Sequence, residues 1–188
     1  MLEWYEFIFI GLASLAGGFI NAIAGGGTLI TFPVLTAVGL PAVVANITNT
    51  VALSPGYLGA TIAQWNDLKS QKKRMLLFIP AAIIGGIIGG ILLLNTGEKL
   101  FRSLVPFLIL LASVLLAVGD PLRNFINRKL STRGASLEHI QYAILPVILA
   151  AMYGGYFGAG LSVIVLAVLG FLINDSLTRL NALKQSIS

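Results

Sequence analysis

Long apolar runs separated by short polar segments set the organisation of this chain. Crossing the hydrocarbon of a bilayer takes about 20 apolar residues in a helix, and several runs reach that length. The pattern predicts membrane helices over residues 4–23, 41–63, 75–94, 103–118 and from 140 onward. The predicted fold class is therefore all-α, a polytopic membrane helical bundle.

A glycine run interrupts the first of these stretches. Gly25–Gly27 ends the run that begins at Trp4, and the next run, Thr28–Val38, has only half the length of a span. Gly is about 1 kcal/mol less favourable than Ala inside a helix, so we predict a break over residues 24–28. Backbone groups freed by a break find no partners in hydrocarbon, so it must be buried in protein or line a polar cavity. The alternative is close helix packing through small residues.

The second half repeats this pattern. A glycine-rich stretch over residues 152–160 is followed by the short apolar run Leu161–Ile173. In both halves a turn then leads into a helix with an early asparagine, Asn46 in the first and Asn181 in the second. Short, Gly-interrupted hydrophobic segments in corresponding halves are typical of a transporter with its site at the membrane midplane.

Polar side chains gather at the start of the helix predicted over 41–63. Asn46, Thr48, Asn49 and Thr50 fall within five residues, which is costly in lipid and favours a position facing the protein interior. Asn46 and Asn49 are three residues apart and share one helix face. They either contribute to a binding site or hold helices together by hydrogen bonds.

Composition and charge agree with a membrane protein. Of 188 residues, 57% are hydrophobic and 10% are charged, whereas soluble domains carry about 25% charged residues. The net charge of +5 does not indicate nucleic-acid binding, because the basic residues concentrate in two segments, Gln64–Arg74 and Asp120–Gln141. Basic segments between apolar runs are typical of cytoplasmic loops. This places the Asn95–Arg102 turn and the N-terminus on the outer side of the membrane. The first repeat then enters the membrane from outside and the second from the cytoplasm, so the repeats are inverted.

The domain organisation follows from the repeats. Residues 1–118 form a first repeat with additional spans, residues 119–139 a cytoplasmic linker, and residues 140–188 a second, incomplete repeat. The asparagine-bearing helix of the second copy is too short to cross a membrane before Ser188. We expect a truncated chain, a split gene, or a product lacking its last spans.

Several chemistries are disfavoured by the residues available. The chain has no cysteine, and its one histidine, His139, lies beside Glu138 in a polar segment. We therefore expect no metal site, no cofactor and no enzymatic activity. The acidic residues lie at span ends or in loops, so no carboxylate in the middle of a span is available for a cation or a proton relay.

The remaining groups suit a small anion. A helix N-terminus carries about half a positive charge and unpaired N–H donors, and each break starts a new short helix. Lys184 adds a full charge on the face of Asn181, or else it is an interfacial lysine reaching for the membrane surface. The predicted substrate-binding residues are Gly25, Gly26, Gly27, Thr28, Asn46, Asn49, Gly158, Ala159, Gly160, Asn181 and Lys184.

These motifs, in this order and hydropathy, resemble the sulfite exporter TauE/SafE family over nearly the whole chain, without the C-terminal end of the family. The matching stretches are 25–28 with Pro33, 45–49, 154–160 and 181–184. The resemblance implies a multi-pass inner-membrane protein that exports sulfite, a sulfonate or a related sulfur oxyanion. The alternative is a non-transporting structural or partner subunit. Expected partners are the anion, the bilayer, and a second copy or a complementing C-terminal fragment.

Overall fold

The computed structural model is all-α throughout the residues it describes, which are 3–24, 26–118, 121, 124, 128, 143–173 and 175–188. This confirms the all-α part of the predicted fold class. Among those residues, three stretches are long and apolar enough to cross a membrane: Trp4–Asn21, Trp65–Thr96 and Glu98–Ala117. The helices are α1 (Trp4–Ala24), α2 (Thr28–Ala37), α3 (Ala42–Ala63), α4 (Trp65–Leu68), the 3-10 helix η1 (Lys69–Gln71), α5 (Lys72–Thr96), α6 (Glu98–Ala117), α8 (Ile144–Tyr156), α9 (Leu161–Leu172) and α10 (Leu177–Ile187).

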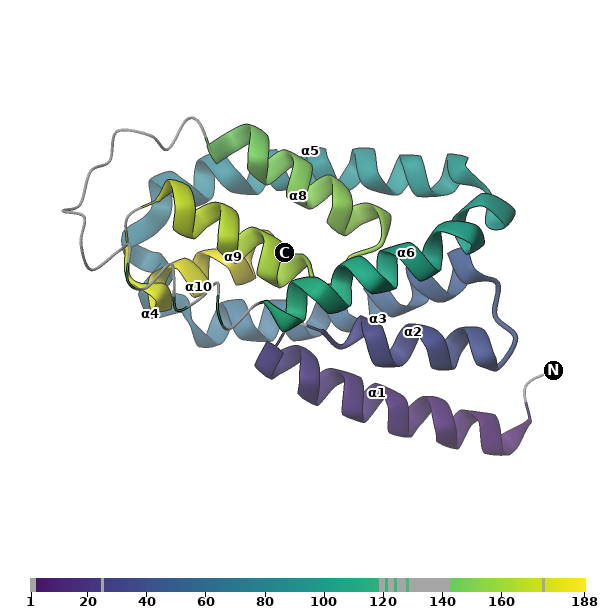
Figure 1. Ribbon diagram of the computed structural model, residues 1–188. Coiled ribbons are helices and arrows are strands. Elements are labelled where there is room, and N and C mark those ends of the chain that lie inside the picture. Colours follow the sequence, from purple (N-terminus) through teal and green to yellow (C-terminus); the bar gives the residue numbers. More distant parts are fainter. Residues whose placement is uncertain are drawn as a thin grey trace.

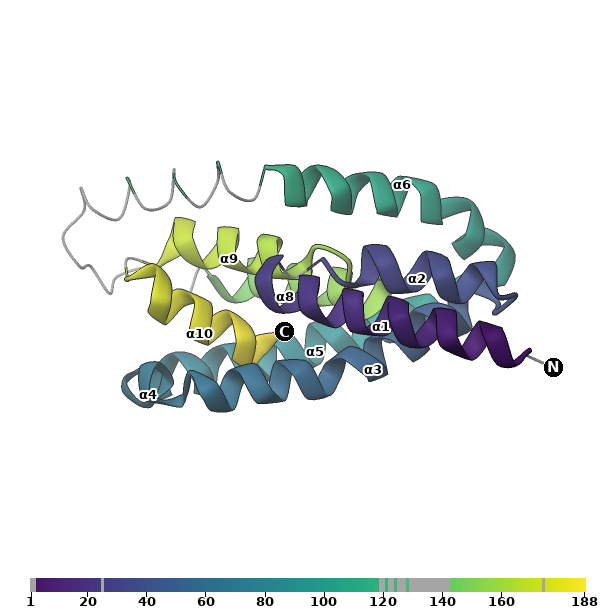
Figure 2. The same cartoon turned by 90° about the horizontal axis from the view of Figure 1, so that it is seen from below.

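The helices lie roughly along one long axis, and two pairs of them turn back halfway (Figures 1 and 2). α1 runs from the end that holds the N-terminus to the middle, and α2 returns to that end. α3 then runs the length of the bundle to α4, and α5 runs back. α8 enters from the α4 end and stops in the middle, α9 returns to the α4 end, and α10 runs from there toward the middle.

Two of the segments predicted as polar turns are mostly helical. The segment 64–74 is taken up by α4, η1 and the first residues of α5, and the turn predicted over 95–102 shrinks to Gly97. Gly97 has a φ of +74°, which glycine adopts at little cost, so one residue suffices to separate α5 from α6. Most of the linker predicted over 119–139 lies outside the described residues.

The buried core joins the two halves of the chain. One cluster packs Phe78 of α5 against residues of α8, α9 and α10, such as Val147, Leu169 and Leu183. A second cluster surrounds Phe32 and includes residues of α2, α3, α5, α6 and the segment after α8. Large apolar side chains on the outer faces of α1, α5 and α6 are exposed, as a lipid-facing surface requires.

Small residues allow α5 and α8 to approach closely. A Cβ atom on Gly85 would collide with the carbonyl oxygen of Ile148, and one on Gly89 with that of Met152. Gly155 of α8 is equally close to the backbone of Gly86. Gly85 and Gly89, which have the GxxxG spacing, therefore form a packing face, whereas nothing lies within 4 Å of a Cβ placed on Gly86 or Gly90.

Replacing Gly89 with valine is expected to lower the free energy of unfolding by about 1–3 kcal/mol, because overpacking forces the two backbones apart. Gly90→Ala is the matched control, since a methyl group there meets open space and favours the helix. Thermal unfolding in detergent checks both variants. Equal melting temperatures for the two would contradict the packing described for α5 and α8.

Candidate functional site

The first turn-back point lies between α1 and α2. α1 ends at Ala24 and α2 begins at Thr28, with Gly26 and Gly27 between them; Gly25 lies outside the described residues. Gly27 packs directly on the backbone of Gly17, and a Cβ on it would collide with that carbonyl oxygen. The glycines therefore let α1 and α2 pack side by side at the point where the chain reverses.

The second turn-back point lies between α8 and α9. α8 ends at Tyr156 and α9 begins at Leu161. Gly158 and Gly160 have φ values of +79° and +74°, in the region that side chains with a Cβ rarely adopt. Ala159 between them is fully buried, and its carbonyl oxygen accepts a hydrogen bond of 2.7 Å from the Tyr153 hydroxyl.

Two asparagines of α3 form hydrogen bonds with residues at both turn-back points. Asn49 donates from Nδ2 to Thr28 Oγ1 at 3.0 Å, and its Oδ1 accepts from the Thr31 hydroxyl. Asn46, one turn earlier, donates from Nδ2 to the carbonyl oxygen of Tyr156 at 3.0 Å. Both side chains are almost fully buried. One face of α3 thus connects segments of the chain that are more than 100 residues apart in sequence.

The two turn-back points lie close together, because Asn49 and Asn46, which contact them, are one turn apart on α3. The rings of Phe32 on α2 and Phe157 after α8 meet edge to face, with centroids 5.5 Å apart. Phe101 of α6 packs on the same ring of Phe157 at 6.2 Å. Phe157, in the segment between α8 and α9, is therefore packed against both α2 and α6.

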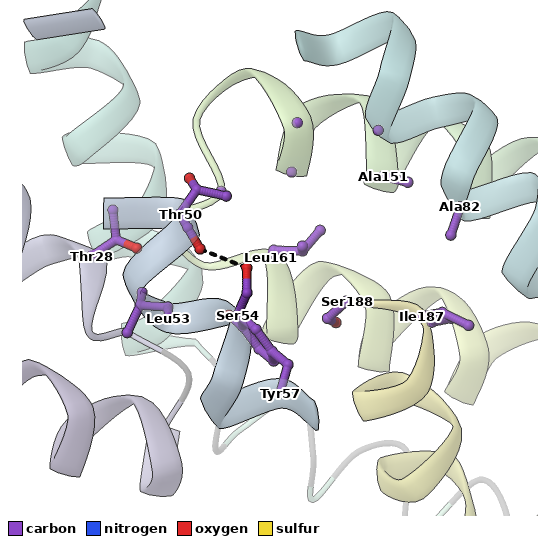
Figure 3. Close-up of a pocket in the computed structure, with 14 residues that line it drawn as sticks. Thr28, Thr50, Leu53, Ser54, Tyr57, Ala82, Ala151, Leu161, Ile187 and Ser188 are labelled. Atoms are coloured by element: carbon purple, nitrogen blue, oxygen red, sulfur yellow. Dashed lines mark hydrogen bonds between the residues drawn. The ribbon is translucent and has the colours of Figure 1, made fainter. Parts of the chain in front are cut away.

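A cavity of about 160 Å³ opens beside this junction (Figure 3). Of the predicted site residues, Thr28 and Gly158 line it; Asn46, Asn49, Asn181 and Lys184 do not. The lining comes from α2, α3, α5, α8, α9 and α10, and from the segment between α8 and α9. It comprises Thr28, Thr50, Leu53, Ser54, Tyr57, Ala82, Gly86, Ala151, Gly154, Gly155, Gly158, Leu161, Ile187 and Ser188.

Three polar residues of α3 that were not predicted to belong to a site also line the cavity. Thr50, Ser54 and Tyr57 follow one another at spacings of four and three, which places them on one helix face. This spacing is the signal by which they could have been found. The Tyr57 hydroxyl lies within hydrogen-bonding reach of the Asn21 and Ser162 side chains, and so connects α1, α3 and α9.

Asn181 lies elsewhere. Its Nδ2 donates to Gln64 Oε1 at 2.9 Å, at the α4 end of α3. Gln64 follows Asn46 by 18 positions, or about 27 Å along a helix, so the prediction that Asn181 joins Asn46 and Asn49 in one pocket is wrong. The reason is that α10 starts at the opposite end of the bundle from α3, and Asn181 is only the fifth residue of α10. Lys184, on the same helix, is 8% exposed.

A buried ion pair connects the two halves of the chain at the α4 end of the bundle. Arg74 at the start of α5 pairs with Asp175, which precedes α10. Arg179 Nη1 lies 3.3 Å from Asp175 Oδ1, and its backbone oxygen accepts a hydrogen bond of 2.9 Å from Gln71 Nε2. Arg74 and Gln71 are both buried, so this network lies inside the protein.

Metal-binding groups do not gather within the described part of the chain. No cluster of three or more His, Cys, Asp or Glu residues occurs there. His139 and Glu138 lie outside the described residues.

Comparisons with known proteins identify relatives over most of the chain. The profile of the family described as "Sulfite exporter TauE/SafE" matches residues 10–188. A "Probable membrane transporter protein" of Haemophilus influenzae is 30% identical over 81% of this chain and 59% of its own length. "Probable membrane transporter protein YfcA" of Escherichia coli K12 is 26% identical over 77% of this chain and 52% of its own length.

A third relative, "Probable membrane transporter protein ORF9" of Sinorhizobium sp, is 24% identical over 85% of this chain and 59% of its own length. This chain therefore spans between half and three fifths of the length of these curated relatives. No solved structure matches it.

Proposed function

Because this chain belongs to the sulfite exporter TauE/SafE family, we propose that it acts in secondary-type export of a small anion across the inner membrane. The proposed substrates are sulfite, a sulfonate or a related sulfur oxyanion. Its relatives are named probable membrane transporter proteins, which supports transport as the class of function. Activity, substrate, inner-membrane location and number of spans are all part of the proposal.

The observation that carries the proposal is the junction of the two turn-back points. Two short helices, α2 and α9, begin there, beside a cavity with hydroxyl groups in its wall. Most N–H groups in the first turns of α2 and α9 donate to the carbonyl oxygens of Gly26, Gly27, Gly158 and Gly160, so what these helix starts bring is mainly partial positive charge, which favours an anion. Asn46 Oδ1 is buried without a hydrogen-bond partner among the described residues, and such an acceptor is costly unless a hydrogen-bond donor, from water or from a ligand that carries a proton, pairs with it.

The arrangement of the helices supports inverted repeats as part of this proposal. α1 and α2 turn back toward the N-terminal end, and α8 and α9 turn back toward the α4 end (Figure 1). α3 and α10 begin at these opposite ends, and each carries an asparagine as its fifth residue. Two antiparallel units that meet at their breaks can rock against each other, which exposes the junction to either side in turn.

The proposed substrate contacts come from the breaks and the cavity. The first break supplies Gly25, Gly26 and Gly27 with Thr28, and the second supplies Gly158, Ala159 and Gly160. Asn46 and Asn49 position these segments, and Lys184 supplies positive charge from α10. Asn181, whose amide is bonded to Gln64, is left out of the proposed pocket.

We predict that the α4 end faces the cytoplasm, because basic residues at 69 and 72–74 cluster there. The chain contains no native cysteine, so single cysteines report position without background. In right-side-out vesicles, an impermeant thiol reagent should label Asn95→Cys and leave Ser70→Cys unlabelled until the membrane is opened. Both sites are exposed and lie at opposite ends of α5. Labelling of both from one side would contradict this orientation.

Flux measurements test the transport proposal. Purified chain in proteoliposomes should release preloaded radiolabelled sulfite faster than protein-free vesicles do. The relative from Haemophilus influenzae, reconstituted in parallel, serves as the positive control because it is longer. If that relative transports sulfite and this chain, correctly folded and inserted, does not, the proposal fails for this chain.

A partner subunit is the second candidate function. The observation that favours it is the length of the relatives, of which this chain covers only 52–59%. Thr50 and Ser54 are also exposed although they line the cavity, as residues facing further helices would be. Under this alternative, flux appears only when a fragment corresponding to the rest of a relative is co-expressed, and the two pieces purify together.

A further inference from the structure

The hydroxyl groups of the cavity are oriented as acceptors. Thr50 Oγ1 donates its proton to the carbonyl oxygen of Asn46 at 3.0 Å, and Ser54 Oγ donates to that of Thr50 at 2.9 Å (Figure 3). Ser188 Oγ donates likewise to Lys184 O at 3.0 Å. A hydroxyl has one proton and two lone pairs, so these three groups offer lone pairs to the cavity.

Two hydroxyls in the wall, those of Thr28 and Tyr57, donate to no carbonyl oxygen among the described residues. Thr28 Oγ1 accepts from Asn49 Nδ2, which leaves its own proton for the cavity. The unpaired Oδ1 of Asn46, one turn before Thr50, is another acceptor beside the site. The polar side chains therefore provide more acceptors than donors.

The side chains of the wall also carry no full charge. None of the described residues that line the cavity is acidic or basic; Tyr57 is the titratable group among them, and Lys184 lies one turn before Ser188 on α10. Lys184, the proposed source of positive charge, matches one negative charge, and transferring a second one out of water without a matching cation is costly. A dianion is thus disfavoured by charge as well as by the shortage of donors.

We propose that the cavity selects a singly charged oxyanion that carries its own hydrogen-bond donor, so that hydrogen sulfite binds and the sulfite dianion and sulfate are rejected. The inference rests on the proposed function and narrows its substrate class. The single hydrogen of the ligand is donated to Thr50 or Ser54, while one of its oxygens accepts from Thr28. A cavity of about 160 Å³ suits such a ligand, since one water molecule takes up roughly 30 Å³ in the liquid.

The test compares three anions by thermal stabilisation of the reconstituted chain and by competition against sulfite flux. Sulfite is measured at mildly acid pH, where hydrogen sulfite predominates, and at mildly alkaline pH, where the dianion predominates. Methanesulfonate, a monoanion without a donor at either pH, controls for titration of the protein. Sulfate is the dianion control.

Sulfite at acid pH should bind at least about tenfold more tightly than sulfate, with methanesulfonate between them, since a hydrogen bond to a charged group contributes roughly a factor of ten. Sulfite affinity should fall as pH rises, and methanesulfonate affinity should not. Ser54→Ala should weaken sulfite binding about threefold to tenfold. Ser103→Ala, which removes a similarly bonded hydroxyl from α6 away from the cavity, should not.

Sulfate competing as well as acid sulfite, or sulfite affinity rising with pH, would overturn the selection of hydrogen sulfite while leaving anion transport intact. An unchanged sulfite affinity in Ser54→Ala would overturn the role of the α3 hydroxyls. Absence of binding and flux for every anion would instead overturn the proposed function, and this inference with it.

Discussion

Replacing Asn46 with leucine is expected to abolish anion flux while the protein still inserts into the membrane. Leucine has the same branching and the same number of side-chain heavy atoms but lacks the amide that donates to the carbonyl oxygen of Tyr156. That bond joins α3 of the first half to the end of α8 in the second. Its loss leaves a buried acceptor unpaired, which costs about 1–3 kcal/mol, and frees the second turn-back point from α3. Flux per inserted molecule measures the effect, and we expect it to fall by about tenfold or more.

Thr48→Val is the matched control for this change, because it removes a polar group from an exposed position of the same helix. It should keep both flux and melting temperature. If the Asn46→Leu protein transports at the normal rate, Asn46 is not part of the site. Protein that fails to accumulate in the membrane would make Asn46 a purely structural hydrogen-bonding residue, which is the alternative that the sequence left open.

Replacing Arg74 with glutamine is expected to have the largest effect on stability. Arg74 and Asp175 are paired with side-chain exposures of 10% and 9%, so the change leaves a buried carboxylate without its closest cation. Removing one partner of a buried pair typically costs about 3–5 kcal/mol. We expect the lower end of this range, because Arg179 Nη1 at 3.3 Å and the backbone N–H of Ser176 at 2.8 Å still contact Asp175. Thermal unfolding in detergent measures the loss.

Two further variants separate the ion pair from a general effect of charge. Lys73→Gln removes a neighbouring positive charge at an exposed position and should leave the melting temperature nearly unchanged. Adding Asp175→Asn to Arg74→Gln should restore part of the stability, because the unpaired charge is gone and the two sites are coupled. A double variant no more stable than Arg74→Gln alone would contradict the role of this pair in joining the halves.

The helices were predictable because they depend on local properties. Apolar runs of membrane length predicted the extent of α1, and α2 begins at Thr28, after Gly26 and Gly27. Pro41 stands directly before α3, where its missing N–H is not needed. Segment polarity was a poorer guide: residues 64–74 are mostly helical because α4 and η1 pack against the start of α10 and the turn before it.

The partners of the polar residues were decided by tertiary structure alone. The spacing of Asn46 and Asn49 predicted that they share one helix face, but it did not predict their partners. Asn49 binds Thr28, and Asn46 binds the carbonyl oxygen of Tyr156, 110 positions away. Asn181, which occupies the corresponding position in α10, pairs with Gln64 instead, because α10 and α3 start at opposite ends of the bundle. The cavity wall that contains Thr50, Ser54 and Tyr57 exists only because α8, α9 and α10 pack beside α3. Hydropathy and glycine act within a few residues of their own position, whereas a hydrogen bond between distant segments exists only where helix packing brings its donor and acceptor within about 3 Å.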